Sequence, residues 1–231
     1  MKSYYSHLQS TLEFGEKKLI TKKPILRSSG VFPVIHNQNF STSIHFLGYW
    51  LLKRQIPEVT LTITLRDEYG KTLLRKIEII NEPKVFSINL DSILKEIQLY
   101  EDFLGSIEIE FNTTRDMVFP FPALVLEYYN KFFNTCVHTL GRIYNDFEDL
   151  QQNDEFKVPE TGFDIHETND LHSFLSFVNG PISNDDGIIE YEVTNSDSEK
   201  LNGKFHLGKM NQFETKFIEF GKIIPELSNF L

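Results

Sequence analysis

The sequence predicts an all-β protein with two tandem antiparallel β-sandwich domains, the second of them incomplete, and a short helical turn in each domain. Apolar and polar residues alternate over short runs, which turn residues separate. The pattern of residues 60–111 also recurs towards the C-terminus. Residues 62–67 return as 190–195, and Ile77 returns as Phe205 at the same offset. Such a recurrence predicts two related domains.

The first domain is predicted to cover residues 30–145, after an N-terminal arm at 1–29. A count of about seven or eight short strands and one short helix is typical of a sandwich. Pro33 has no amide hydrogen, so its strand is expected at a sheet edge. The expected elements are strands at 31–35 and 43–52, a hairpin turning at 67–70, a strand at 85–90, a helical turn capped by Asp91 or Ser92, and strands at 106–111, 123–128 and 132–144.

Residues 106–111 form the most regular of these expected strands. Ile107 and Phe111 are expected to face the core, while Glu108 and Glu110 are expected on the opposite face. The alternation therefore predicts a half-buried strand.

An acidic and amide-rich linker is predicted at 146–161, before the second domain at 162–231. Leu231 corresponds to Leu104, so the second copy has no counterpart of residues 105–111. A sandwich without these strands would expose apolar surface and unpaired edges. Three explanations stay open: the sequence is a fragment, another chain completes the domain, or the repeat is coincidental.

Composition restricts the partners and the compartment. The net charge of −10, from 33 acidic and 23 basic residues, argues against general nucleic-acid or anionic-membrane binding. Basic residues in the first thirty positions suit a solvated arm or, alternatively, a polyanion site. Cys136 is the single cysteine, and no signal peptide or run of eighteen apolar residues occurs, so we expect a cytoplasmic protein without a membrane span.

The strongest local candidate for chemistry is the segment 136–142. Cys136 and His138 lie two residues apart on an expected strand and should share a face, together with Arg142 if the strand is regular. Thiol catalysis competes here with a core role for Cys136. His138 and Arg142 alternatively bind a carboxylate, a phosphate or sugar hydroxyls, or form a salt bridge with a nearby acid. The expected neighbours are Glu127, Tyr128, Arg115, Asp116 and Asp146.

No metal or cofactor is expected. The seven histidines are scattered, and Asp164, His166 and Asp170 are more typical of a solvated loop than of a cation site. Glycine-rich phosphate loops and other enzyme signatures are absent from the sequence. Aromatic side chains offer a carbohydrate-stacking platform or ordinary core packing. These are Tyr49, Trp50, Tyr128, Tyr129 and Tyr144.

The order of strands in each copy resembles the small β-sandwich of the sensory rhodopsin transducer family. The residues that carry the resemblance are 171–179, 190–195, 204–207 and 213–220, with the parallel segments of the first copy. The resemblance implies a cytoplasmic, oligomer-forming binding module and no catalytic residues. The two copies and the added arm depart from the family, so signalling to a photoreceptor is not implied.

The sequence thus supports two functional hypotheses. The first is a non-catalytic interaction or ligand-binding protein that self-associates and takes a carbohydrate or a small anion, through His138, Arg142, Tyr128 and Arg115. The second is a carbohydrate-active or acyl-transfer enzyme with His138 as acid and base, Arg142 as electrostatic stabiliser and Glu127 beside them.

Overall fold

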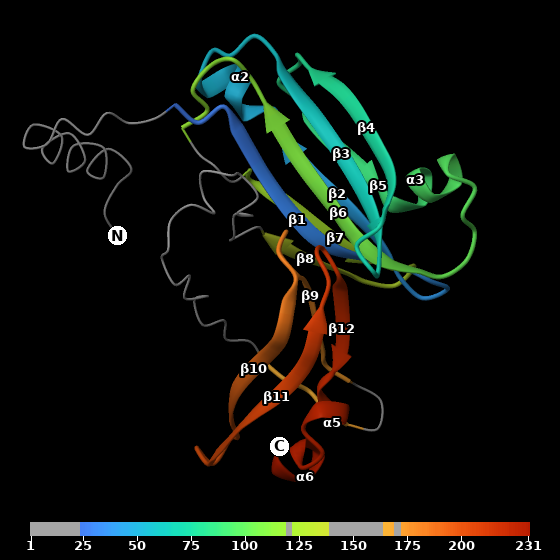
Figure 1. Cartoon of the computed structure of the whole chain (residues 1–231), viewed down its shortest axis with the longest axis vertical. Helices are drawn as coiled ribbons and strands as arrows, with labels where there is room; N and C mark the ends of the chain where they lie inside the picture. Colours follow the sequence, from blue (N-terminus) through green and yellow to red (C-terminus); the bar gives the residue numbers. More distant parts are fainter. Residues whose placement is uncertain (1–23, 119–121, 139–163, 169–171) are drawn as a thin grey trace, which may run out of the picture.

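The computed structural model describes residues 24–118, 122–138, 164–168 and 172–231. These residues are mostly β-sheet, which confirms the predicted all-β class (Figure 1). The strands are β1 (Arg27–His36), β2 (Ser41–Leu47), β3 (Val59–Asp67), β4 (Thr72–Ile80), β5 (Val85–Asn89), β6 (Phe103–Asn112), β7 (Leu124–Tyr129), β8 (Asn134–His138), β9 (Phe174–Val178), β10 (Asn184–Thr194), β11 (Lys200–Met210) and β12 (Thr215–Glu219). The helices are short: α2 (Tyr49–Lys53), α3 (Leu90–Glu96), α5 (Phe220–Ile223) and α6 (Leu227–Phe230).

Strands β1 to β8 form an antiparallel sandwich. One sheet has the order β1-β6-β3-β4 and the other the order β5-β2-β7-β8. Their inner faces share one core, in which the Phe46 ring of β2 meets the Phe111 ring of β6 at 5.1 Å between centroids. Pro33 lies in β1 at the edge of its sheet, as its missing amide hydrogen predicts.

Two local expectations were wrong. The strand expected at 43–52 ends at Leu47, and a helical turn follows because Trp50 folds back into the core, where its ring packs 4.5 Å from that of Phe111. Helix α3 begins directly after Asn89, earlier than caps at Asp91 or Ser92 would place it. The side chain of Asn89 does not cap the helix, since its Oδ1 accepts a hydrogen bond from the Ser43 hydroxyl.

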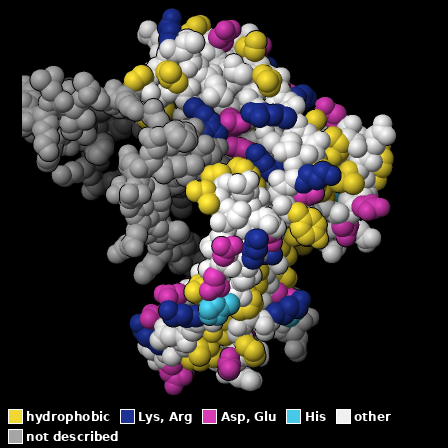
Figure 2. Space-filling model, in the orientation of Figure 1, with side chains coloured by type: hydrophobic (Ala, Val, Ile, Leu, Met, Phe, Trp, Pro, Cys, Tyr) yellow, Lys and Arg dark blue, Asp and Glu magenta, His cyan; other side chains and the backbone are white. Residues whose placement is uncertain are grey.

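The outer face of β6 also differs from expectation. Glu108 and Glu110 point away from the sandwich core, yet they are only 3% and 7% exposed. Arg27 of β1 reaches both carboxylates, at 3.3 and 2.6 Å, and Arg66 of β3 binds Glu108 at 2.6 Å. Dark blue and magenta side chains accordingly alternate on this face in Figure 2. Cross-strand ion pairs therefore replace the solvent that the alternation predicted for these glutamates.

The C-terminal residues form a smaller β unit. Strands β9 and β12 pair with each other, and β10 pairs with β11. A separate small core lies beneath them, with α5 and α6 contributing to it. Its buried members are Val193, Phe220, Ile224 and Leu227.

The hairpin turns β3–β4 and β10–β11 have the same construction. The Oδ1 atom of Asp67 accepts hydrogen bonds from the backbone amides of Tyr69 and Lys71. Asn195 does the same for Asp197 and Glu199. Both turns contain one residue with positive φ at the same place, Gly70 (86°) in the first and Ser198 (66°) in the second.

The C-terminal unit packs against the end of the sandwich where the β3–β4 turn lies (Figure 1). The amide of Thr215 donates to the carbonyl of Glu68 at 2.9 Å. The Phe213 ring covers the Arg66 guanidinium, 4.1 Å from its centroid. A Cβ atom on Gly70 would overlap the carbonyl oxygen of Gln212. The contact between the two units thus includes a backbone hydrogen bond, a close backbone approach at Gly70 and a cation–π pair.

Several predicted boundaries fall outside the described residues. The linker at 146–161 and most of the arm at 1–29 are among them, while β1 already begins at Arg27 inside the predicted arm. None of the helices in the described ranges has the length and apolar character needed to cross a membrane.

Candidate functional site

A shallow groove of about 600 Å³ lies on the outer face of the sheet β5-β2-β7-β8. Successive residues of a strand face opposite sides of the sheet. Apolar residues such as Ile44 and Leu126 point into the core, so the polar residues between them line the groove on the outer face. The turn between β7 and β8 forms one end of the groove. The lining residues are Ser43, His45, Ser87, Asn89, Glu127, Tyr129, Asn130, Lys131, Phe132, Phe133 and Asn134.

Three of these side chains form a hydrogen-bonded chain across three strands. The Nε2 atom of His45 lies 3.0 Å from Glu127 Oε2, and its Nδ1 atom lies 2.8 Å from the Ser87 hydroxyl. The cross-strand register explains the contact, since His45 stands directly opposite Ser87 and lies two positions along β2 from Ser43, the partner of Glu127, on the same face of the sheet. Pairing of neighbouring strands thus brings together three residues that are far apart in the sequence.

The protonation of this chain follows from its carboxylate. Hydrogen bonds from the Asn134 amide, at 2.7 Å, and from His45 lower the pKa of Glu127. A charged carboxylate only accepts hydrogen bonds, so in neutral His45 the proton lies on Nε2. Nδ1 is then the acceptor and the Ser87 hydroxyl is the donor. This arrangement holds the imidazole in one tautomer and one orientation.

The β7–β8 turn presents an aromatic rim to the groove. The Asn130 side chain accepts hydrogen bonds from the amides of Phe132 and Phe133, at 2.7 and 3.0 Å, which fixes the turn. Phe133 packs edge-on against Phe40. Phe132 is 92% exposed, an unusual position for a large apolar side chain. The turn therefore holds a free aromatic face beside the polar floor.

The formal charges in the groove cancel. Within the part of the chain that the structure describes, Glu127 is the one acid and Lys131 the one Lys or Arg in the lining. Hydroxyl and amide groups supply most of the remaining polar surface, from Ser43, Ser87, Asn89, Asn134 and Tyr129. Such a lining combines donors and acceptors without a net field.

The structure brings only some of the predicted site residues together. Glu127 lies directly opposite Cys136, and His138 stands on the same outer face as both. Cys136 is exposed, so it is not the core hydrophobe that competed with catalysis in the sequence analysis. Arg142 lies outside the described residues, as does Asp146, so their predicted convergence with His138 stays a prediction.

Two other predicted residues lie away from the groove. Tyr128 points to the inner side of its sheet, where its hydroxyl donates to the carbonyl of Pro33 at 2.8 Å. Burial raises the pKa of Tyr128 to about 12. Arg115 belongs to the loop after β6 and donates to the carbonyl of Gln55 at 3.0 Å. Both contacts are structural in character.

The aromatic residues that the sequence suggested as a stacking platform do not lie together. Trp50 is buried in the core with Tyr49 stacked on it at 4.2 Å, so neither ring forms a surface platform. Tyr129 lines the groove, and Tyr144 lies outside the described residues. The aromatic residues that do flank the groove, Phe132 and Phe133, follow a turn signal at Asn130 that the sequence displays.

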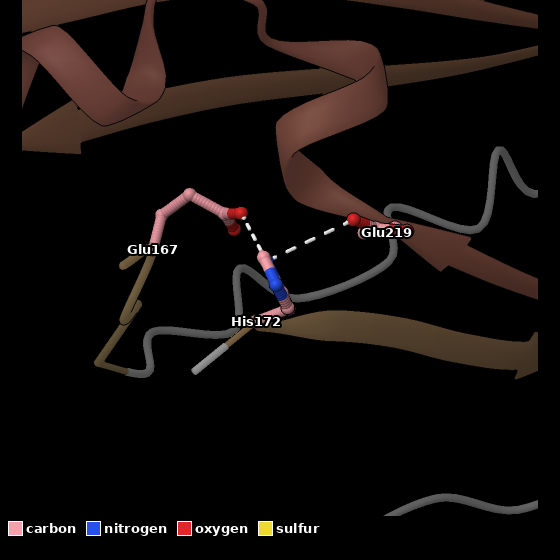
Figure 3. Close-up of side chains that lie close together, drawn as sticks. All are labelled: Glu167, His172 and Glu219. Carbon is pink, nitrogen blue, oxygen red and sulfur yellow. Dashed lines mark hydrogen bonds and ion pairs between the residues drawn. The ribbon is translucent and has the colours of Figure 1, made fainter. Parts of the chain in front are cut away.

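A second cluster of polar groups lies in the C-terminal unit. Glu167, His172 and Glu219 place one possible metal-ligand atom each within 4.8 Å of one another (Figure 3). Of the residues suspected from the sequence, Asp164 and His166 are not members of this cluster, and Asp170 lies outside the described residues.

Fold and groove together define an all-β protein in which one sheet of a sandwich carries a polar, aromatic-rimmed groove on its outer face. Comparison of the chain with protein-family models, with curated proteins and with solved structures gives no match. The resemblance to the sensory rhodopsin transducer family therefore stays a prediction.

Proposed function

We propose that this chain is a non-catalytic ligand-binding protein and that its groove takes a neutral carbohydrate. The observation that carries the proposal is the exposed Phe132 ring beside a polar floor of balanced charge. A sugar ring offers an apolar face for stacking and hydroxyl groups that both donate and accept hydrogen bonds. Glu127 and Asn134 supply the matching acceptors and donors.

The same lining disfavours the small anion that the sequence left open. Lys131 is the one ammonium or guanidinium group among the described residues of the groove, and Glu127 would repel a carboxylate or phosphate. Charged Glu127 also keeps His45 in a hydrogen bond, so the imidazole is not free to bind an anion. A neutral polyhydroxylated ligand meets neither penalty.

A glycan array that carries neutral and anionic oligosaccharides side by side tests this proposal. We expect the full chain to bind neutral glycans and Phe132→Ala to lose that binding, since the stacking surface is gone. Tyr100→Ala is the matched control, because Tyr100 is a 75% exposed aromatic residue outside the groove lining. Absence of glycan binding, or equal binding by the Phe132 variant, would refute the proposal.

One observation favours a second function, hydrolysis of esters. Ser87, His45 and Glu127 form the hydrogen-bonded series of nucleophile, base and orienting acid. In this reaction the Ser87 oxygen bonds to the acyl carbon while its proton passes to His45 Nδ1. The alcohol leaves with that proton as the ester C–O bond breaks, and water then releases the acid. This assignment differs from the predicted pair of His138 and Arg142, which stays a separate prediction because Arg142 lies outside the described residues.

Hydrolysis of p-nitrophenyl acetate tests this second function. Ser87→Ala should abolish turnover above background, whereas Ser196→Ala should leave it unchanged, because Ser196 is an exposed serine of the β10–β11 turn. Equal rates for the two variants would rule out Ser87 as a nucleophile. Glycan binding without esterase activity would leave the non-catalytic function.

The proposal includes two related β units, with predicted boundaries at 30–145 and 162–231, and self-association of the chain. The equivalent turns at Asp67 and Asn195 support the relation. Among the described residues, the sheets β9–β12 and β10–β11 have two strands each, so their edges are open to another chain. Light scattering coupled to size-exclusion chromatography should show a stable oligomer, and a monomer at every concentration would contradict self-association.

We also propose that the protein is located in the cytoplasm.

A further inference from the structure

The cluster of Glu167, His172 and Glu219 joins three segments of the C-terminal unit (Figure 3). Glu167 and His172 face each other across an isolated antiparallel bridge, and Glu219 ends β12 immediately before α5. Backbone contacts fix the approach, since the amide of Phe220 donates to the carbonyl of Ser173 at 3.0 Å. The three side chains therefore meet because the backbone of these segments is already held together.

The Glu167 carboxylate has an unused oxygen. Its side chain is only 8% exposed, and Oε2 is buried without a hydrogen-bond partner. Its Oε1 atom lies 2.6 Å from Nδ1 of His172, so the carboxylate is aimed into the cluster. A buried carboxylate oxygen without a partner is costly, and structures normally compensate it with a donor or a cation.

Glycine at position 221 makes room for this carboxylate. A Cβ atom there would lie 2.9 Å from Glu167 Oε1, closer than such contacts occur. Lys222 binds Glu219 Oε2 at 2.7 Å and leaves Glu219 Oε1 directed at His172, 3.8 Å from Nδ1. One oxygen of Glu219 thus stays turned towards the cluster.

We propose that Glu167, His172 and Glu219 form a binding site for a zinc ion. An imidazole nitrogen with two carboxylate oxygens is a ligand set that suits zinc, whereas magnesium and calcium prefer oxygen alone. Ligand atoms around a tetrahedral zinc ion lie roughly 3.3–3.5 Å apart, given bonds of about 2.0–2.2 Å. The observed separations of 2.6 and 3.8 Å bracket that value, so small side-chain shifts accommodate the ion.

The ion would take the place of a proton. The hydrogen bond between His172 Nδ1 and Glu167 Oε1, 2.6 Å long, has a proton where the ion would bind. Zinc requires a neutral imidazole nitrogen, so binding releases that proton. The two carboxylates would neutralise the ion, and water would complete its coordination. The bound ion would link the segment 164–168 to β9 and β12.

Calorimetric titration of zinc chloride into the chelator-treated and dialysed full chain at neutral pH tests the site. We expect binding of zinc in preference to magnesium, and affinity at least about tenfold weaker in His172→Gln. His206→Gln is the matched control, because His206 also contacts one acid, Asp186 at 3.3 Å, but belongs to no such cluster among the described residues.

Glu219→Gln gives an independent test, since Glu219 lies near the surface and its replacement keeps the shape of the side chain. Circular dichroism without zinc should show that both variants fold. Zinc should then raise the melting temperature of the wild type and of His206→Gln, but not of the cluster variants. Equal zinc affinity in the wild type and His172→Gln, or equal binding of magnesium, would overturn the site.

Discussion

Asp67 and Asn195 hold two separate hairpin turns through the same pair of side-chain hydrogen bonds. Each Oδ1 atom accepts the amides of the residues two and four positions later, at distances between 2.9 and 3.1 Å. Either a carboxylate or an amide side chain can supply the accepting oxygen of this turn. Asn195 differs from Asp67 in that its amide nitrogen also donates to Glu199 and to the carbonyl of Phe230, at 3.0 and 3.2 Å. The relationship supports the proposed kinship of the two β units.

Replacing either residue by alanine should loosen its turn. The accepted backbone amides are solvent-exposed, so we expect a loss of about 0.5–1.5 kcal/mol in unfolding free energy for Asp67→Ala. Asn195→Ala also removes the two hydrogen bonds that its amide nitrogen donates, so its loss should be at least as large. Urea denaturation followed by circular dichroism measures the loss. Asp197→Ala provides the control, because Asp197 is exposed and contributes only its backbone amide to the turn. An equal loss in that variant would remove the role of the side-chain acceptors.

Breaking the buried ion pair between Arg66 and Glu108 should lower the unfolding free energy more than loss of either turn residue. Glu108→Ala would leave the Arg66 guanidinium, whose Nη1 already has no hydrogen-bond partner, in a buried position without its carboxylate. We expect a loss of about 3–5 kcal/mol, as for other broken buried pairs.

A surface pair serves as the comparison. Lys84 and Glu82 are 2.7 Å apart, but both side chains are more than half exposed, so Glu82→Ala should cost at most about 1 kcal/mol. Chemical denaturation of both variants gives the difference. Similar losses at the two sites would show that the outer face of β6 is more hydrated than its burial indicates.

Substitution of Gly70 tests whether the two β units are in contact at this residue. Gly70→Ala would combine a strained positive φ of 86° with overlap against the carbonyl of Gln212. Gly208→Ala separates these effects, because Gly208 also has a positive φ, 68°, but open space where its Cβ would lie.

We expect Gly208→Ala to cost roughly 1 kcal/mol and Gly70→Ala distinctly more. The excess measures the steric contact with the C-terminal unit. Thermal unfolding of the two variants in parallel gives this number. Equal losses would mean that the units do not press against each other at Gly70 in solution.

Tyr128 predicts a loss of stability at alkaline pH. Burial raises its pKa from 10.0 to about 12, so the folded protein keeps the phenol proton where the unfolded chain releases it. The contribution of Tyr128 to stability is therefore complete below pH 10 and is lost as the pH rises towards 12.

Urea denaturation between pH 8 and about pH 11.5 detects this loss. In Tyr128→Phe the alkaline decline should be shallower, although the hydrogen bond to the Pro33 carbonyl is also removed at every pH. Identical alkaline slopes in the wild type and the variant would show that Tyr128 ionises equally easily in both states.

The strand pattern and hairpin pairing could be predicted because both depend on neighbours in the sequence. Alternation identified β6, and Pro33 correctly indicated an edge strand. The helical turn at Trp50 could not be predicted in this way, because an apolar run of that length suits a strand or a short helix equally well. Its conformation is decided by core packing against Phe111.

The groove could not be predicted, because it depends on register between strands. His45, Ser87 and Glu127 meet across sequence separations of 42 and 82 residues. The same is true of Glu108, whose partners Arg66 and Arg27 come from 42 and 81 residues away. Cys136 and His138 share a face of β8, as their spacing predicted, and Glu127 lies opposite Cys136 because β7 and β8 are adjacent strands joined by a short turn.

Cys136 gives the protein a built-in attachment point for a reporter. Its exposed thiol is the single one in the sequence and stands opposite Glu127 at the edge of the sheet that bears the groove. A maleimide fluorophore would therefore couple at one position without any mutation. Its emission would follow occupancy of the groove in real time, independently of which molecule fills it.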